Sequence, residues 1–486
     1  MRRSTFAFGA LLGAFLSGCA VGPGYHAPAP PPAGRAVGGP AADSLRSFFD
    51  SLAARTGVND MRGSPLLPGA DTLQELAWVD LLRDSTLLEL VRTAVRENKD
   101  IQLALSRVKE YRALVGAERG GLFPQVSANG AAGKQQIVIG SFGAVGFDYY
   151  RVTADLAWEL DFWGRVRRGV AAAQADYQAR DADARATLLT LVSDVATAYI
   201  ELRELDADLA VAERTLTSRQ ETLRLAQRRF DQGVISELDV RGFEAAVAQP
   251  AARVAQFQRL RVRKEHQLSV LLGRPPQDIP RGRALEESVR AVDVPDSVSS
   301  TLIVRRPDVQ SAERELAAQT ARVGVAVGNR LPQFLVTGQY GRQSENPDAL
   351  FKSQSEIYTA QAGVSIPLFT GGTLVNLERA ARARVEQARA FYDQTVLNAL
   401  REVGDALIGV RTSKGELAAQ RLQVQALRRA LQLAERRYEN GLSSYLEVLD
   451  TQRSLFDAEI AVSQTERQYL VSAVELYKAL GGTWRE

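Results

Sequence analysis

The chain carries the same sequence pattern twice, at a constant spacing of 208 residues. The segment Leu223–Gly233 reads LRLAQRRFDQG, and Leu431–Gly441 reads LQLAERRYENG. Further pairs that keep this spacing are Asp100 with Asp308, Pro124 with Pro332, Gln125 with Gln333, Leu160 with Leu368, and Gly164 with Gly372. Such a period is far longer than the roughly 20–50 residues of solenoid repeats. We therefore predict an internal duplication of one large module, with copies at 76–280 and 281–486.

Residues 1–18 have the layout of a secretory signal peptide. A start with two arginines precedes an apolar stretch at 6–16, which is too short to span a bilayer. The stretch leads into LSGC, which resembles the lipobox of bacterial lipoproteins, so we predict cleavage before Cys19 and its lipidation. Cys19 is the only cysteine in the chain, and lipidation would leave no disulfide. The alternative is an ordinary cleavage site that happens to contain a cysteine.

The segment 19–75 is predicted to be a lipidated N-terminal tether followed by an insert. Ala20 follows Cys19, in place of the aspartate that typically retains lipoproteins in the inner membrane. Proline and glycine crowd residues 22–40, a composition typical of an extended linker. The sequence of the insert at 41–75 indicates no particular structure.

Composition excludes several classes of protein. The formal charge of +3 falls to +1 without the two arginines of the signal, which argues against a nucleic-acid partner. No apolar run after position 19 is long enough for a transmembrane helix. The histidines, His26 and His266, and the single cysteine cannot assemble a soft-metal site. No acid–base pair, nucleophile motif or phosphate-binding loop stands out, so we expect neither an enzyme nor a cofactor, apart from the lipid on Cys19.

Two segments have the apolar pattern of very long helices. Over 188–216 the apolar positions alternate in steps of three and four, and the stripe resumes after a break at Arg219. This period predicts a left-handed coiled coil. The proline-free span 165–232 would form a helix about 100 Å long, and the segment 374–440 repeats it.

Each long helix is predicted to end at a glycine and to be followed by a returning helix. Gly233 and Gly441 suit the left-handed backbone just past a helix end. Nearby serines that could cap the next helix are Ser236, Ser443 and Ser444. The returning helices are expected at 237–272 and 445–480, and shorter helices at 98–119 and 306–328. A returning helix of about 55 Å and a short helix of roughly 30–35 Å, placed end to end, nearly equal the length of one long helix. This match in length predicts a cylinder wall of even height.

Between the short and long helices the sequence alternates with a period of two. The clearest run is 152–162, with Leu156 on the apolar side and Asp155 on the polar side. We predict hairpins at 124–162 and 332–369, with strands of about ten residues. Their apolar face would pack on a core in a soluble protein, or contact lipid in an outer-membrane barrel. Four strands cannot close a barrel, so a membrane location requires several chains, and three chains would supply about 12 strands.

Several motifs together resemble the outer-membrane efflux protein family, the TolC-like and NodT-like channel lipoproteins. They are CAVGPGY at 19–25, WELDFWGR at 158–165, RRPD at 305–308, IPLFTGG at 366–372, RYENG at 437–441 and YLEVLDTQR at 445–453. Each is weak alone, but together they are highly specific and cover nearly the whole mature chain. The resemblance implies an α+β membrane protein. Its homotrimer would form a 12-stranded outer-membrane β-barrel, four strands per chain, continued by a long periplasmic α-helical coiled-coil barrel.

The same resemblance implies a function and partners. Members of the family form the outer-membrane exit channel of a tripartite efflux system that conducts drugs or other small solutes. The implied partners are a periplasmic membrane-fusion adaptor and an inner-membrane transporter, of the resistance-nodulation-division type. The chain would lie in the cell outer membrane, held by its lipid, and extend into the periplasm. Its sequence does not identify the exported solute, because an open duct selects little.

The resemblance also implies a gate at the periplasmic tip. The matching positions are Leu446, Glu447 and Asp450, and threefold symmetry would turn each acid into a ring that attracts cations. From the residues alone, the simpler interpretation is that the two acids solvate one helix face. The turns expected to dock the adaptor carry Gly233, Ser236, Gly441, Ser443 and Ser444.

Two other functions stay open at the level of sequence. A duct for secreted polypeptides would share every feature above, and only neighbouring genes would separate it from a drug channel. A lipid-anchored coiled-coil scaffold or pump adaptor would explain the heptads and the lipobox. It would not explain the alternating strands.

Overall fold

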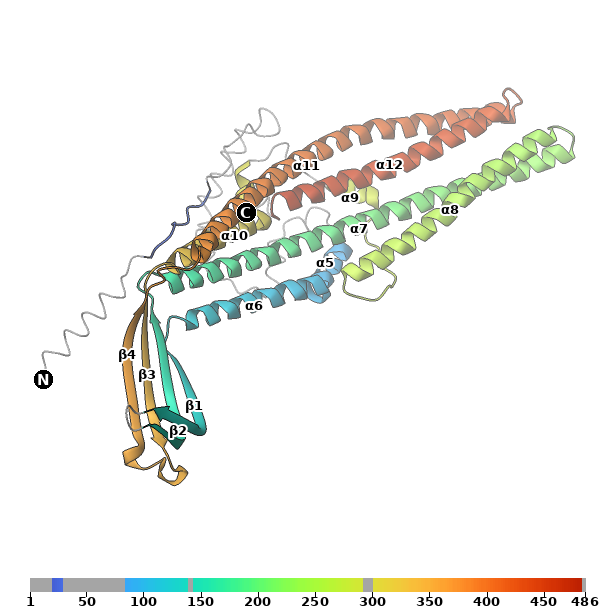
Figure 1. The fold of residues 1–486 in the computed structure, drawn as a ribbon. Helices are drawn as coiled ribbons and strands as arrows, with labels where there is room; N and C mark the ends of the chain where they lie inside the picture. Colours follow the sequence, from blue (N-terminus) through green and yellow to red (C-terminus); the bar gives the residue numbers. More distant parts are fainter. Residues whose placement is uncertain (1–19, 29–83, 139–142, 292–299, 483–486) are drawn as a thin grey trace. The chain divides into compact units, whose positions relative to one another are not determined.

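A computed structural model describes residues 20–28, 84–138, 143–291 and 300–482 (Figure 1). These residues are mostly helical and contain one four-stranded sheet. They divide into two units, which are described separately below. The predicted signal peptide 1–18, Cys19 and the insert at 41–75 lie outside the described residues.

The first unit contains the sheet, with its strands in the order β1-β2-β3-β4 and every neighbouring pair antiparallel. The strands are β1 Gln125–Val138, β2 Ala144–Leu160, β3 Gln333–Ser344 and β4 Glu356–Ser365. Both predicted hairpins are therefore present, and β2 of the first pairs with β3 of the second. The expected length of about ten residues is wrong for β1 and β2, which have 14 and 17. Their ladder continues to the pair Val138 and Ala144, because backbone groups pair there without side-chain alternation.

The two faces of the sheet differ as the alternation predicts. One face carries apolar side chains that no other part of the described chain covers: Val126, Val152, Tyr340 and Val364. The opposite face carries hydroxyls, amides and a carboxylate, with Thr153 buried and Asp155 half-buried. A single chain thus presents a broad apolar surface, which soluble monomers rarely expose.

A short junction carries β2 into the long helix α7 (Arg165–Asp231). Asp161 caps the helix, since its two carboxylate oxygens accept from the backbone N–H groups of Val166 and Arg167, at 3.0 and 2.8 Å. Gly164 has a φ of +76°, which a residue with a side chain rarely adopts. Trp163 donates its indole N–H to the carbonyl of Pro332 at 2.8 Å, tying the first hairpin to the start of the second.

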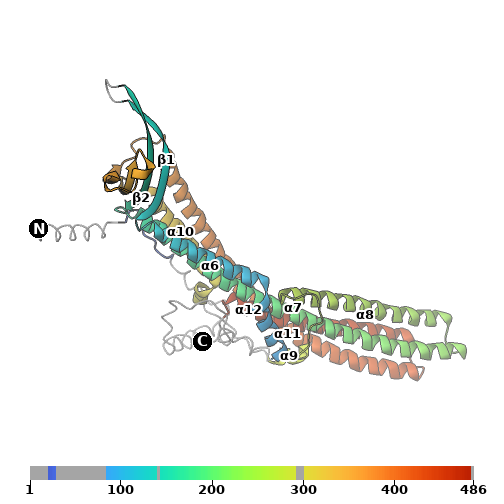
Figure 2. The same cartoon turned by 90° about the horizontal axis from the view of Figure 1, so that it is seen from below.

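The long helices occur in pairs of equal length. Helices α7 and α11 (Thr373–Glu439) have 67 residues each, and α8 (Glu237–Leu271) and α12 (Tyr445–Ala479) have 35 each. The shorter α6 (Lys99–Gly120) and α10 (Pro307–Gly328) have 22 each. Each pair starts at the predicted spacing. In both views α8 runs beside α7, and α12 beside α11 (Figures 1 and 2).

The sequence patterns did not indicate the remaining elements. These are α5 (Ser85–Glu97), α9 (Leu285–Ala291), and the 3₁₀ helices η2 (Ser300–Arg305), η3 (Pro347–Ala349) and η4 (Ser353–Ser355). Helix α5 is well anchored. The buried carboxylate of Asp84 caps it and also accepts from the Tyr199 hydroxyl and the Arg283 N–H, both at 3.0 Å. These contacts tie α5 to α7 in the core of the second unit.

The predicted turns after α7 and α11 are present. Gly233 and Gly441 have φ values of +73° and +71°, so a side chain at either position would strain the backbone. Ser236 caps α8 through a capping box, in which its hydroxyl and the Asp239 carboxylate bond reciprocally to backbone N–H groups. Ser444 precedes α12, but its side chain makes no capping hydrogen bond.

The break in the coiled-coil stripe has a structural reason. Arg219 is only 3% exposed, and its guanidinium donates to the Ala246 carbonyl at 2.7 Å and to Gln249 Oε1 at 3.0 Å. Pro250 lies four residues after Ala246 inside α8 and has no N–H to give that carbonyl. Arg219 therefore replaces the missing helical hydrogen bond from the neighbouring helix.

The second module lacks this pair. Positions 427 and 458, which correspond to Arg219 and Pro250, are Leu427 and Ala458. An alanine can donate its own N–H within the helix, and a leucine continues the apolar stripe. The second module therefore lacks both the proline and the arginine that compensates for it.

Arg219→Leu should lower the free energy of unfolding by about 1–3 kcal/mol, because the partly buried Ala246 carbonyl loses its donor. Adding Pro250→Ala should recover much of that loss, since a helical hydrogen bond to Ala246 becomes possible. Melting curves of both single variants and the double variant in detergent would check this. Additive effects of the two changes would contradict the pairing.

Candidate functional site

The ends of the two helix hairpins pack on each other around an aromatic pair. Phe243 of α8 and Tyr445 of α12 are buried, with ring centroids 3.4 Å apart. Ala226, Ala434 and Val448 complete this apolar cluster, to which all four long helices contribute. The α7–α8 and α11–α12 turns are thereby held next to each other.

The predicted gate residues lie at the start of α12, beside this cluster. Leu446 is 72% exposed and has no apolar cover from the described part of the single chain. Asp450 is exposed, and its carboxylate lies 2.6 Å from the Arg453 guanidinium. The Glu447 carboxylate lies 3.8 Å from Arg437. The three residues therefore share the start of one helix, as the sequence predicts, and two arginines accompany them.

Sequence reasoning missed these arginines. The signal was available, because Arg453 follows Asp450 at the i, i+3 spacing that brings two helical side chains together. The ion pairs weaken the negative electrostatic potential at the start of α12, since each carboxylate has a cation beside it. A ring built from Asp450 would be a ring of ion pairs, and removal of the acid would leave unpaired positive charge.

The predicted docking turns carry apolar side chains as well as the expected glycines and serines. Exposed side chains beside Gly233 and Gly441 belong to Val234, Leu238 and Leu442, and Leu238 is 81% exposed. Ser443 differs from the prediction of a simple cap. Its hydroxyl is buried and finds no hydrogen-bond partner among the described residues. Val234, Leu238 and Leu442 thus form apolar knobs at the turns, which glycine and serine signals in the sequence do not indicate.

The segment that follows Cys19 is fixed to the first unit. The Val21 N–H donates to the Trp163 carbonyl at 2.9 Å, at the junction between β2 and α7. The Tyr25 hydroxyl donates to Glu313 Oε1 at 3.0 Å, on α10. Residues 20–25 form what we call the strap, and it begins at the end of the sheet.

Two glycines allow the strap to approach α10 closely. A Cβ on Gly22 would lie 2.5 Å from the Gly324 Cα, which no side chain can tolerate. Gly22 also has a φ of +97°. A larger residue at position 22 would therefore both strain the backbone and lift the strap off the helix.

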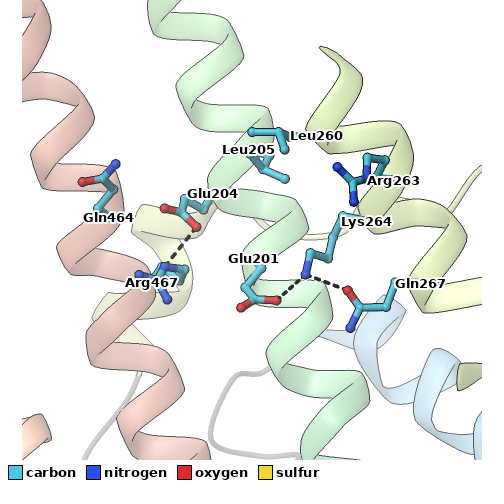
Figure 3. Close-up of a pocket in the computed structure, with 9 residues that line it drawn as sticks. All are labelled: Glu201, Glu204, Leu205, Leu260, Arg263, Lys264, Gln267, Gln464 and Arg467. Carbon is cyan, nitrogen blue, oxygen red and sulfur yellow. Dashed lines mark hydrogen bonds and ion pairs between the residues drawn. The ribbon is translucent and has the colours of Figure 1, made fainter. Parts of the chain in front are cut away.

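A polar pocket of about 570 Å³ opens in the second unit, over α7 between α8 and α12 (Figure 3). Two ion pairs border it. Lys264 donates to Glu201 at 2.7 Å, and Arg467 of α12 lies 3.0 Å from Glu204. One turn further along α7, the buried carboxylate of Asp208 accepts from the Ser463 hydroxyl. The three acids lie on one face of α7.

Burial changes the proton affinity of two of these acids. Desolvation raises the pKa of Glu204 from 4.5 to about 7, and the nearby Arg467 offsets only part of this effect. Desolvation also raises the pKa of Asp208, from 3.8 to about 6, against the hydrogen bond from Ser463. Sequence reasoning did not single out either residue, because burial of an acid on a long amphipathic helix cannot be told from its spacing.

Two other features are absent from the described residues. Among them, no group of three or more histidines, cysteines, aspartates or glutamates could hold a metal ion. None of the helices in the described ranges is both long and apolar enough to cross a membrane.

Comparison with known proteins gives the family. The family model described as outer membrane efflux protein matches residues 90–274 and 298–482. The antibiotic efflux pump outer membrane protein ArpC of Pseudomonas putida is 33% identical over 476 residues, which cover 97% of this chain and 94% of ArpC. The toluene efflux pump outer membrane protein TtgC, also of Pseudomonas putida, has the same identity and coverage.

A solved structure has the same fold. The open state of the MtrE outer membrane channel of Neisseria gonorrhoeae is 27% identical, with a TM-score of 0.79 over 95% of this chain and 98% of MtrE. The likeness to the MtrE fold and the two matches of the family model therefore point to the same family. The chain belongs to the outer membrane efflux protein family.

Glu204→Gln should make stability less dependent on pH. A carboxyl group whose pKa is higher in the folded state favours folding most at low pH, and this contribution is lost as pH rises from about 4.5 to about 7. The wild-type protein should therefore lose stability between pH 5 and pH 8, and the variant should lose about 1–2 kcal/mol less. Melting temperatures at the two pH values measure the difference.

Glu213→Gln provides the matched control, because Glu213 is an exposed acid on the same helix. It should retain the wild-type pH dependence. An unchanged pH dependence in Glu204→Gln would show that this carboxyl is not the desolvated group.

Proposed function

We propose that the chain is the outer-membrane exit channel of a tripartite efflux system and conducts drugs or other small solutes. The match of the outer membrane efflux family to both halves of the chain carries this proposal. The names of relatives support small solutes rather than polypeptides, since ArpC is named for antibiotic efflux and TtgC for toluene efflux. The scaffold alternative is disfavoured, because it leaves the strands without a role.

In the proposed assembly three chains form a 12-stranded barrel in the outer membrane. Each chain supplies a sheet with two free edges, at β1 and β4, and an uncovered apolar face. Free edges cannot lie in lipid, so the edges of three sheets would pair with one another. The four long helices of each chain would continue the barrel into the periplasm as a coiled-coil cylinder.

The proposed domain organisation follows from the predicted duplication. After a signal peptide at 1–18 and a tether and insert at 19–75, the first module covers 76–280 and the second 281–486. Equal helix lengths in both halves support this division. We propose no enzymatic activity for the chain and no cofactor apart from the lipid on Cys19.

Lipidation of Cys19 would place the acyl chains at the membrane surface. The strap supports this, because it starts one residue after Cys19 and is bound at the end of β2. Cys19→Ser should abolish labelling of the protein by radioactive palmitate. Labelling at the wild-type level in the variant would exclude this site.

The partners would bind at the helix hairpin ends. A periplasmic membrane-fusion adaptor would contact the turns at Gly233, Ser236, Gly441, Ser443 and Ser444, where the apolar knobs offer contact surface. An inner-membrane transporter of the resistance-nodulation-division type would supply the solute. The efflux pumps named for the relatives support such partners.

The gate would consist of Leu446, Glu447 and Asp450 around the threefold axis. A permanently open duct would leak periplasmic contents, so the tip should be closed at rest. Three Leu446 side chains would form an apolar constriction, and the ion pairs of Asp450 with Arg453 would surround it.

The purified trimer should conduct ions in planar bilayers, and Asp450→Ala should change that conductance. Loss of the acid leaves Arg453 without its partner, so cation preference should fall while single-channel conductance rises. Single-channel recordings and reversal potentials in a salt gradient measure both. Glu213→Ala, which removes an exposed charge elsewhere on α7, should have a much smaller effect.

The outcomes separate two claims. Trimers that assemble but carry no current, both as wild type and with Asp450→Ala, would refute the channel. A conducting trimer in which Asp450→Ala alters neither conductance nor selectivity would refute only the gate.

A further inference from the structure

One row of residues on the polar face of the sheet consists of neutral polar groups and a single acidic residue. Asp155 lies on β2, directly opposite Gln339 on β3 and Ser127 on β1. Thr359 of β4 continues the row opposite Gln339. The row therefore crosses all four strands, and the carboxylate lies at its centre.

Three neutral donors hold this carboxylate in place. Asn129 donates to Oδ2 at 2.6 Å, and the Thr153 hydroxyl donates to the same oxygen at 3.0 Å. Gln339 donates to Oδ1 at 2.7 Å. A carboxylate has about four acceptor positions, so one position, on Oδ1, stays available. Because the donors carry no charge, they fix the geometry without cancelling the negative charge.

A cavity of about 680 Å³ lies on the sheet at this row. Amides and hydroxyls provide most of its polar lining, from Gln125, Ser127, Thr337, Gln339, Thr359 and Gln361. Asp155 is the one charged residue among the described residues that line it. The volume is in the range of sites that hold drug-sized molecules.

A cation on the same face, Arg151, has other partners. It lies four residues before Asp155 along β2, so the two Cα atoms are about 13 Å apart. The Arg151 guanidinium donates to Gln343 at 2.8 Å and lies over the Tyr149 ring, 5.8 Å from its centroid. It therefore contributes only a distant positive charge, while the donors to Asp155 described above are all neutral.

We propose that Asp155 and its row of polar groups form a binding site for organic cations on the wall of the exit path. The inference rests on the proposed channel, in which the polar face lines the pore and the apolar face contacts lipid. A protonated or quaternary amine would approach the available Oδ1 position, and the amides would contact its polar substituents. Three copies of the site would surround the axis, on the outer-membrane side of the gate.

Block of the channel by tetraethylammonium tests this site. The ion is added to the barrel side of wild-type trimers in planar bilayers, and the concentration for half-block is measured. Asp155→Asn keeps the shape of the side chain but removes the charge. We expect block to weaken roughly threefold to tenfold, and the potassium-to-chloride permeability ratio to fall.

Two further variants make the test specific. Asp348→Asn removes the same charge from η3, where the side chain is exposed away from the row, and should leave half-block within roughly twofold of wild type. Gln361→Glu adds a carboxylate to the lining of the same cavity and should strengthen block. The second variant keeps the test decisive if Asp155→Asn fails to assemble.

Each result has one meaning. Weaker block with Asp155→Asn supports the site, provided that Asp348→Asn resembles wild type. Where Asp155→Asn fails to assemble, stronger block with Gln361→Glu supports the site and unchanged block overturns it. Equal block in conducting wild-type and Asp155→Asn channels overturns the site and leaves the channel itself intact. Absence of current from both the wild-type trimer and its Asp450→Ala variant instead overturns the proposed function.

Discussion

The passage from strand to helix is the constraint on which the first unit depends. A strand with an alternating apolar face must give way, within a few residues, to a helix with a stripe of period 3.5. Asp161 satisfies the first free N–H groups of α7, and Gly164 supplies the backbone angle that turns the chain. Without both, either the strand would continue past the sheet or the helix would start with unpaired donors. The strap and the start of the second hairpin are bound to this same junction.

Periodicity made most of the architecture predictable. The long helices, their returns and both hairpins lie within a few residues of the spans that the sequence predicts, because two periods, 3.5 and 2, are hard to confuse over such lengths. Backbone pairing extended β1 and β2 through residues that lack alternation. Helix α5 was missed because it is short and its position in the core depends on tertiary partners such as Tyr199.

The candidate site was less predictable than the fold. Family motifs singled out Asp450, and the i, i+3 spacing to Arg453 was a signal for the ion pair that the motif alone does not make explicit. The apolar side chains at the turns, such as Leu238, were passed over because glycine and serine are the usual turn signals. The desolvation of Glu204 depends on α8 and α12 lying on either side of α7. That arrangement depends on tertiary packing, which cannot be predicted from the sequence of one helix.

The strap has a consequence for the lipid around the protein. A chain of a few extended residues reaches only about 3.5 Å for each residue, and Val21 is already bound to the junction. An acyl group on Cys19, as proposed, would therefore be attached at most about 7 Å along the chain from Val21. In the proposed trimer three sets of acyl chains would stand at fixed points around the barrel rather than trail on loose tethers. These attached acyl chains would travel with the protein as it diffuses.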